Sequence, residues 1–205
     1  MALTIIKPRA VDLSETFNFT GTVTGDNVGG GNLVKISEQT ASASSSISFT
    51  GIDSTYRTYL FKFINIHPAS ISRLIFQTST NGGSNYGVTM TSTTFGAYHA
   101  ESNSEATLQY LAGSDNTQTT AFQELTPNIA TTNDASCSGE LWLFNPSSTT
   151  YVKHYMSNIN TENQTYSFQL FSAGYFNTTS AVNAVQFKMN SGNIDDGTIT
   201  MYGIA

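Results

Sequence analysis

Charged side chains are scarce in this chain. Asp, Glu, Lys and Arg make up 11% of its 205 residues, well below the roughly 25% that is usual for globular proteins. The net charge is −6, and the eight basic residues are scattered along the sequence. Because binding to nucleic acid through a basic patch requires clustered Lys and Arg to neutralise phosphates, we expect no nucleic-acid partner.

Cysteine is nearly absent, since Cys137 is the only one. A single cysteine excludes an internal disulfide, so stability must come from packing or from assembly. A nucleophilic thiol needs a base partner, and no histidine lies near Cys137 in the sequence. We therefore interpret Cys137 as a half-buried structural thiol.

Long hydrophobic runs are also missing. No apolar stretch approaches the roughly eighteen residues of a membrane-spanning helix, so no membrane insertion is expected. The opening "LTII" is short, and its basic residues follow it, whereas a secretion signal has them in front. We expect an unprocessed chain that is made in a cytoplasm.

Motifs for catalysis or for metal binding are lacking too. His67, His99 and His154 are far apart, and no phosphate loop or G-x-S-x-G turn occurs. Asp195 and Asp196 in "NIDDG" lack the spaced ligands of a calcium loop, and a turn explains them, although bound calcium is left open. We predict no enzyme activity, no metal and no cofactor. The enzyme alternative is a polysaccharide depolymerase, with four candidate carboxylates: Glu101, Glu105, Glu124 and Glu140.

Ser, Thr, Asn and aromatic residues fill the chain instead. Aromatic residues make up 12%, enough for a core, and short strand-like runs recur between Gly, Pro, Asn and Ser clusters. One short helix is expected around 99–111. The pattern predicts an all-β fold, an antiparallel β-sandwich of the jelly-roll type. The expected strands lie near 33–37, 46–50, 56–66, 71–79, 86–94, 106–112, 119–125, 139–144, 151–157, 165–172, 182–189 and 197–204.

The first 31 residues differ from the rest. They end in the glycine run at 29–31, which can act as a hinge. We predict an extended N-terminal arm over 1–31, which docks onto a larger particle, and a β-sandwich body over 32–205. The alternative is an ordinary first strand whose phenylalanines belong to the core. The candidate docking residues are Ile5, Ile6, Lys7, Pro8, Arg9, Phe17 and Phe19.

Several expected strands carry large apolar side chains on both faces. In "TYRTYLFKFINI" the alternation of a strand puts Tyr59, Phe61 and Phe63 on one face. Leu60, Ile64 and Ile66 would share the other. The same doubling recurs in "ELWLFNP" and "TYSFQLF". One face can line the sandwich, so a second copy of the chain is expected on the other, in a homo-oligomer with a trimer favoured. The alternative is that the chain's own loops cover this face. The candidate self-assembly strand is Tyr59, Leu60, Phe61, Phe63 and Ile64.

The motif order resembles a known class. The stretches "ISFTGIDSTYRTYLFKFINIHPAS", "SGELWLFNPSSTTYVKHYMS" and "AVNAVQFKMNSGNIDDGTITMYGIA" are similar to a domain in structural proteins of tailed bacteriophages, especially those of marine and cyanobacterial hosts. There it occurs at the ends of tail-fibre and other appendage proteins. The opening "MALTIIKPR" with "FNFTGTVTGDN" is similar to the leader of such proteins. The resemblance implies a trimeric β-sandwich on the virion surface.

Two functions compete under this reading. The first is a structural protein of the virion, a short appendage or a capsid decoration protein that the arm docks to other virion proteins. The second is a receptor-binding module, a tail fibre that recognises a host surface glycan or an envelope protein. Aromatic rings beside Asn and Asp suit sugar stacking, and the candidates are Tyr86, Tyr98 and Trp142.

Overall fold

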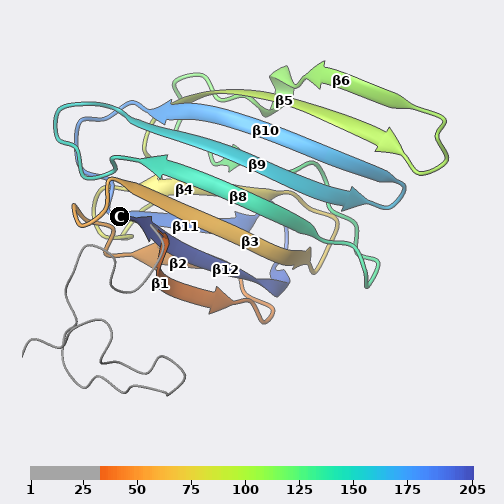
Figure 1. The fold of residues 1–205 in the computed structure, drawn as a ribbon, viewed down its shortest axis with the longest axis horizontal. Coiled ribbons are helices and arrows are strands. Elements are labelled where there is room, and N and C mark those ends of the chain that lie inside the picture. The colour runs from red at the N-terminus through yellow and green to blue at the C-terminus, as the bar shows by residue number, and fades with distance from the viewer. Residues whose placement is uncertain (1–32) are drawn as a thin grey trace, which may run out of the picture. The chain divides into compact units, whose positions relative to one another are not determined.

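The computed structural model describes residues 33–205, which form an all-β, antiparallel body of twelve strands (Figure 1). The predicted arm over 1–31, with its docking residues and the alternative placing of Phe17 and Phe19, lies outside the described residues. The described part has no helix long and apolar enough to cross a membrane. The strands are β1 (Leu33–Thr40), β2 (Ile47–Thr50), β3 (Thr58–Pro68), β4 (Leu74–Ser79), β5 (Met90–Ala100), β6 (Ala106–Tyr110), β7 (Gln123–Glu124), β8 (Cys137–Phe144), β9 (Lys153–Asn163), β10 (Tyr166–Phe176), β11 (Ala184–Met189) and β12 (Ile194–Ile204).

The strands form two sheets whose pairing is that of a jelly roll. The larger sheet has eight strands in the order β1-β12-β3-β8-β9-β10-β5-β6, and the smaller has four in the order β2-β11-β4-β7. β1 pairs with β12, and β2 pairs with β11. β3 then pairs with the other side of β12, and β4 with the other side of β11. This nested pairing places β1 to β4, and likewise β11 and β12, alternately in the two sheets, and it confirms the predicted jelly-roll sandwich.

Two hairpins extend the larger sheet beyond the sandwich. The hairpin of β5 and β6 is inserted between β4 and β7, and the hairpin of β9 and β10 is inserted between β8 and β11. We call these four strands the extension. They line up beside β8, with β6 at the outer edge (Figure 1). The segment that leads to β7 lies along β5, where Thr119 and Met90 exchange backbone hydrogen bonds and Gln123 reaches the Ser114 carbonyl. This segment covers the inner face of β5 from Met90 to Thr94.

The core lies between the two sheets and is rich in aromatic side chains. Phe187 of β11 sits at its centre, within 5.1–6.3 Å, between ring centroids, of four other phenylalanines. Three of these pairs are edge-to-face and the pair with Phe76 is stacked, and both arrangements add stability beyond the burial of apolar surface. The four rings come from both sheets, so they hold the layers together: Phe49, Phe61, Phe63 and Phe76.

The alternation of the sequence predicted the strands well. Each of the twelve expected segments overlaps an observed strand. The expected helix over 99–111 is wrong, because β5 ends at Ala100 and β6 begins at Ala106, with a turn between them. Ser and Asn in this turn favour non-helical backbone, and Asn103 adopts a positive φ of 55°. The helical turn that the structure does have nearby is a short 3₁₀ segment, η2 (Ala112–Ser114).

Because of a bulge in β3, Ile66 lies on the opposite side of the strand from the one that was predicted. Ile66 was expected on the same side as Leu60 and Ile64, yet it lies in the core. The register of β3 against β8 shifts between Phe63 and Ile66, and Asn65 has a φ of 50°. The shift turns Ile66 inward and leaves Ile64 half exposed, at 50%.

Candidate functional site

The side of the eight-stranded sheet that faces away from the four-stranded sheet carries a band of large side chains. We call this side the outer face. The strand registers place Tyr202, Leu60, Trp142 and Met156 side by side on β12, β3, β8 and β9. Leu60 is enclosed, at 2% exposure, whereas Met156 is 56% exposed. The band is therefore closed at its centre and open toward the extension.

The outer face remains apolar across the extension. Phe171 of β10 stacks on Phe95 of β5, with ring centroids 5.1 Å apart and planes inclined at 12°. Phe95 lies opposite Tyr110 on β6, and Leu108 follows on the same side. Leu108 and Tyr110 are 75% and 61% exposed, although the Tyr110 hydroxyl also donates to the carboxylate of Asp115.

A shallow hollow of about 460 Å³ lies within the outer face. Phe144, Met156 and Tyr175 line it, together with His154 and Ala173. The other end of the face is polar. There Trp142 donates through Nε1 to Glu140 at 3.0 Å, and Gln169 donates to the amide oxygen of Asn158. An apolar centre with a polar border is the usual composition of a protein interface.

The exposed part of this face is as large as the largest apolar patch of a typical soluble protein, which is often functional. Side chains of this size offer about 150–250 Å² each, so Phe95, Leu108, Tyr110 and Met156 together expose on the order of 400 Å². Patches of a few hundred Å² mark interaction sites on many soluble proteins. The candidate functional surface of this protein is therefore its outer face.

The predicted self-assembly strand is divided between the two sides of β3. Tyr59, Phe61 and Phe63 lie in the core between the sheets. Leu60 and Ile64 lie on the outer face. The sequence also predicted the two-sided character of the neighbouring strands. Leu141 and Leu143 are buried in the core, while Trp142 and Phe144 lie on the outer face.

An aromatic pocket of about 180 Å³ lies on the opposite side of the extension. The rings of Tyr98 and Phe168 are 5.4 Å apart and nearly parallel, and Tyr166 meets Tyr98 edge-on at the same distance. The Tyr98 hydroxyl donates to Glu105 at 2.5 Å, and this bond to a carboxylate raises the pKa of the tyrosine. With Asn163 at its border, the pocket combines ring faces with hydrogen-bonding groups.

The three predicted glycan contacts lie in three places. Tyr98 lines the aromatic pocket, Trp142 is on the outer face, and the Tyr86 ring packs against Gly83. Tyr166 and Phe168 were not among the candidates, although they complete the pocket. Their alternation in "TYSFQLF" put them on one face, but the pairing of β10 with β5 is needed to place Tyr98 beside them.

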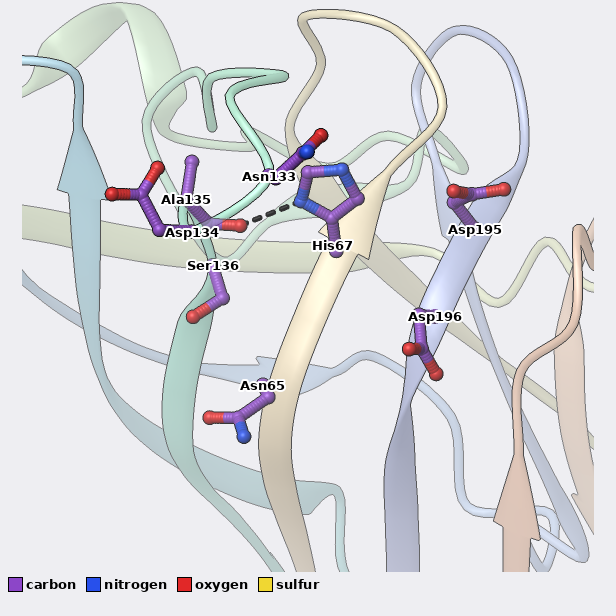
Figure 2. A pocket seen from close by; sticks show the side chains of 8 residues that line it. All are labelled: Asn65, His67, Asn133, Asp134, Ala135, Ser136, Asp195 and Asp196. Atoms are coloured by element: carbon purple, nitrogen blue, oxygen red, sulfur yellow. Dashed lines mark hydrogen bonds between the residues drawn. The ribbon is translucent and has the colours of Figure 1, made fainter.

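A polar cavity of about 460 Å³ lies at the end of β3 and β12 (Figure 2). The Nδ1 of His67 is 2.6 Å from the carbonyl oxygen of Ala135, to which it donates. Asp195 and Asp196 line the cavity from β12, and Asp134 lines it from the segment before β8, with its carboxylate turned away from His67 (Figure 2). The expected Asp-Gly turn is in fact a bulged part of a strand, where Asp196 accepts a hydrogen bond from the Gly197 amide.

Metal-binding geometry is not found in this cavity. Within residues 33–205, no group of three or more His, Cys, Asp or Glu side chains is arranged to hold a metal ion. The other two histidines lie elsewhere, His99 beside Asn103 and His154 beside Tyr175. The cavity is therefore a polar hollow without a metal-binding arrangement among the described residues.

The four candidate carboxylates of a depolymerase do not share a site, and three of them form hydrogen bonds or ion pairs with different neighbours. Glu124 forms an ion pair with Arg73 at 2.6 Å, Glu105 accepts from Tyr98, and Glu140 accepts from Trp142. Glu101 lies in the turn that follows β5. No hydrogen bond or shared cavity joins any two of these four in the described residues.

Comparison with known proteins does not identify a family for this chain. No family model matches the chain, and no curated protein is significantly similar to it. The function must therefore be argued from the faces and pockets of the molecule itself.

Proposed function

We propose that this chain is a non-enzymatic structural protein of a bacteriophage virion surface, which assembles with copies of itself through the outer face. In this proposal it is a short appendage or a capsid decoration protein, and residues 1–31 dock it onto other virion proteins. The observation that carries the assembly is the apolar band on the outer face, from Trp142 to Tyr110. The assignment to a virion rests on the resemblance of the sequence motifs.

A second copy is the occupant that this face suits best. The band carries few charges, so a partner gains little from charge complementarity and much from apolar burial. Bands of two neighbouring copies that pack together around a shared axis would bury about 800 Å² of apolar surface, and the polar residues around them would extend the contact toward the size of a stable interface. We favour a trimer.

Light scattering on the purified full chain tests the assembly. We expect a mass that is a multiple of 22.1 kDa, and we expect Met156→Glu to shift the chain toward the monomer. Met156 is 56% exposed, so a charge there is tolerated by the isolated fold but must be desolvated in an interface. Ile71→Glu is the matched control, because Ile71 is equally exposed but lies outside the outer face. A wild-type chain that remains a 22.1 kDa monomer at all concentrations overturns the proposal.

Retention on particles tests the docking role. The full chain should co-sediment with empty capsids or tails of its phage, and deletion of residues 1–28 should abolish this while the body stays folded. Circular dichroism of the truncated chain checks the fold. If the truncated chain unfolds, Phe17 and Phe19 belong to the core, and the arm is a strand of the body.

A second candidate function is the recognition of a host surface glycan. The aromatic pocket supports it, because Tyr98, Tyr166 and Phe168 offer stacking surfaces beside Glu105 and Asn163. A glycan array with wild-type chain and Tyr98→Ala tests this function. Binding of a glycan that the variant loses supports receptor recognition, whereas uniform silence together with retention on capsids favours a structural role alone.

A further inference from the structure

The sheets of the described residues end in four edge strands, and these differ in how well they are protected. Edge strands invite pairing with another chain unless charge, proline, a bulge or short length prevents it. β1 has an ion pair between Lys35 and Glu38 and a register shift at the same place. β2 has four residues and β7 has two. β6 is the exception, because its five residues, Ala106–Tyr110, contain no charge and no proline, and four of them are exposed.

The backbone of β6 has hydrogen-bonding groups that face away from the sheet. The amide of Leu111 donates to the Thr94 carbonyl, and the amide of Ala100 donates to the Glu105 carbonyl, each at 2.9 Å. In an antiparallel pair the bonded residues alternate, so Thr107 and Gln109 also bond to β5. The backbone groups of the other three residues therefore point away from the sheet: Ala106, Leu108 and Tyr110.

We propose that β6 pairs with β6 of a second copy, antiparallel, about a two-fold axis at Leu108. Two-fold symmetry places Leu108 opposite itself and Ala106 opposite Tyr110 of the other copy. The three outward residues then form about six hydrogen bonds between the chains. The inference rests on the proposed self-assembly and adds a two-fold contact to it, which joins two chains, or two trimers, edge to edge.

The side chains fit this register. Ala106, Leu108 and Tyr110 all lie on the outer face, since they are opposite His99, Ala97 and Phe95 of β5. Across the axis the smallest of them faces the largest, which leaves room for the Tyr110 ring, and the two leucines meet at the centre. Leu108 and Tyr110 are strongly exposed in the single chain, so the pairing shields apolar surface as well as backbone groups.

The position of β6 makes the pairing possible without rearrangement. β6 lies at the free end of the extension, away from β2 and β11 of the smaller sheet (Figure 1). Joining two copies there continues the eight-stranded sheet of one chain into that of the other. The apolar bands of the two outer faces then become one continuous surface.

Leu108→Pro tests the backbone bonds. Proline removes an amide that points outward, so the pairing of β6 with β5 is kept while the contact with the second copy is lost. We expect the dissociation constant for the edge contact to rise about tenfold or more, with no change in the Tm of the monomer beyond that of Ile71→Pro. An unchanged dissociation constant overturns the proposal.

Leu108→Cys tests the register and the symmetry. The two introduced thiols would face each other at a Cα separation of about 5.5 Å, within the range that a disulfide spans. We expect a covalent dimer under mild oxidation and none with Ile71→Cys, while the native Cys137 is buried and does not compete. If the oligomers resist Met156→Glu but form this cross-link, the edge contact is supported and the outer-face contact is refuted. If Met156→Glu disrupts the oligomers but no cross-link forms, the proposed function is supported and the edge contact is refuted.

Discussion

Leu60 and Trp142 lie directly opposite each other on β3 and β8, on the outer face of the eight-stranded sheet. The leucine is enclosed although it points away from the core, because Trp142 flanks it on one side and Tyr202 on the other. The large rings thus close the centre of the outer face within one chain. The apolar surface that is left for a partner lies farther along, from Met156 to Tyr110.

The fluorescence of Trp142 should report the assembly of the chain. It is the only tryptophan, and it lies half-buried on the outer face, next to Met156 in the register. We expect its emission to move to shorter wavelength as protein concentration rises, since a second copy removes water from the ring. Dilution of the wild-type chain, followed by emission scans, measures this.

Met156→Glu provides the control for this signal. Its emission should stay at the long-wavelength position at every concentration, because the charged side chain next to Trp142 prevents close contact. A wild-type spectrum that does not change between nanomolar and high micromolar concentration, while light scattering shows oligomers, would mean that the copies meet away from the outer face.

Local alternation of side chains predicted the strands and their two faces. The runs around Leu141 to Phe144 and Tyr166 to Phe171 each place large side chains on both sides, as the structure has them. The helix expected around 99–111 is wrong because Ser and Asn in this segment favour a turn more strongly than its Glu and Leu favour a helix. The error for Ile66 came from a bulge, which no period-2 pattern contains.

The aromatic pocket could not be predicted because it depends on which strands are neighbours. Tyr98 and Phe168 are far apart in the sequence and meet only because β10 pairs with β5. The insertion of two hairpins into the jelly roll sets that order, and no local motif signals it. For the same reason no local pattern indicates that β6 is an edge strand.

Gly197 should be intolerant of any side chain. It adopts a φ of 110°, and a Cβ there would lie 2.5 Å from the carbonyl oxygen of Asn65 and 2.7 Å from the Cα of Ile66. We expect Gly197→Ala to lower the free energy of unfolding by about 2–4 kcal/mol, since it combines backbone strain with a clash against the neighbouring strand. Urea denaturation measures this loss.

Gly51 offers a matched comparison. Its φ is also positive, at 74°, but a Cβ there would meet no atom within 4 Å. Gly51→Ala should therefore cost only about 1 kcal/mol, the conformational part of the effect. Equal losses at the two positions would show that the bulge in β3 relaxes to admit the methyl group.

Cys137 should be unreactive in the folded chain. The side chain is buried at the start of β8, more deeply than the sequence suggested, and burial raises the pKa of its thiol. Because the thiolate is the reactive form, a thiol reagent such as DTNB should label the native protein very slowly at pH 8 and the urea-unfolded protein at once. Fast stoichiometric labelling without urea would mean that β8 opens readily, and it would contradict the closed core.

Lys153 should make the stability of the fold depend on pH in the alkaline range. Its side chain is fully enclosed, and its ammonium donates to the carbonyl oxygens of Tyr151 at 2.9 Å and Thr178 at 3.1 Å. Among residues 33–205 no carboxylate is bonded to it. Burial lowers the pKa of Lys153 in the folded state below its ordinary value of 10.5. The unfolded chain therefore binds more protons than the folded chain between the lowered pKa and 10.5.

The unfolding free energy of the wild type should then rise with pH in that window, relative to Lys153→Met. Below the lowered pKa both states are protonated, so the difference between the two proteins should be constant there. Urea denaturation of both proteins at intervals from pH 7 to pH 10 measures the difference. Other groups that titrate in this range are common to both proteins, so they largely cancel. A difference that stays flat up to pH 10 would mean that water reaches the ammonium and that the enclosure around Lys153 opens in solution.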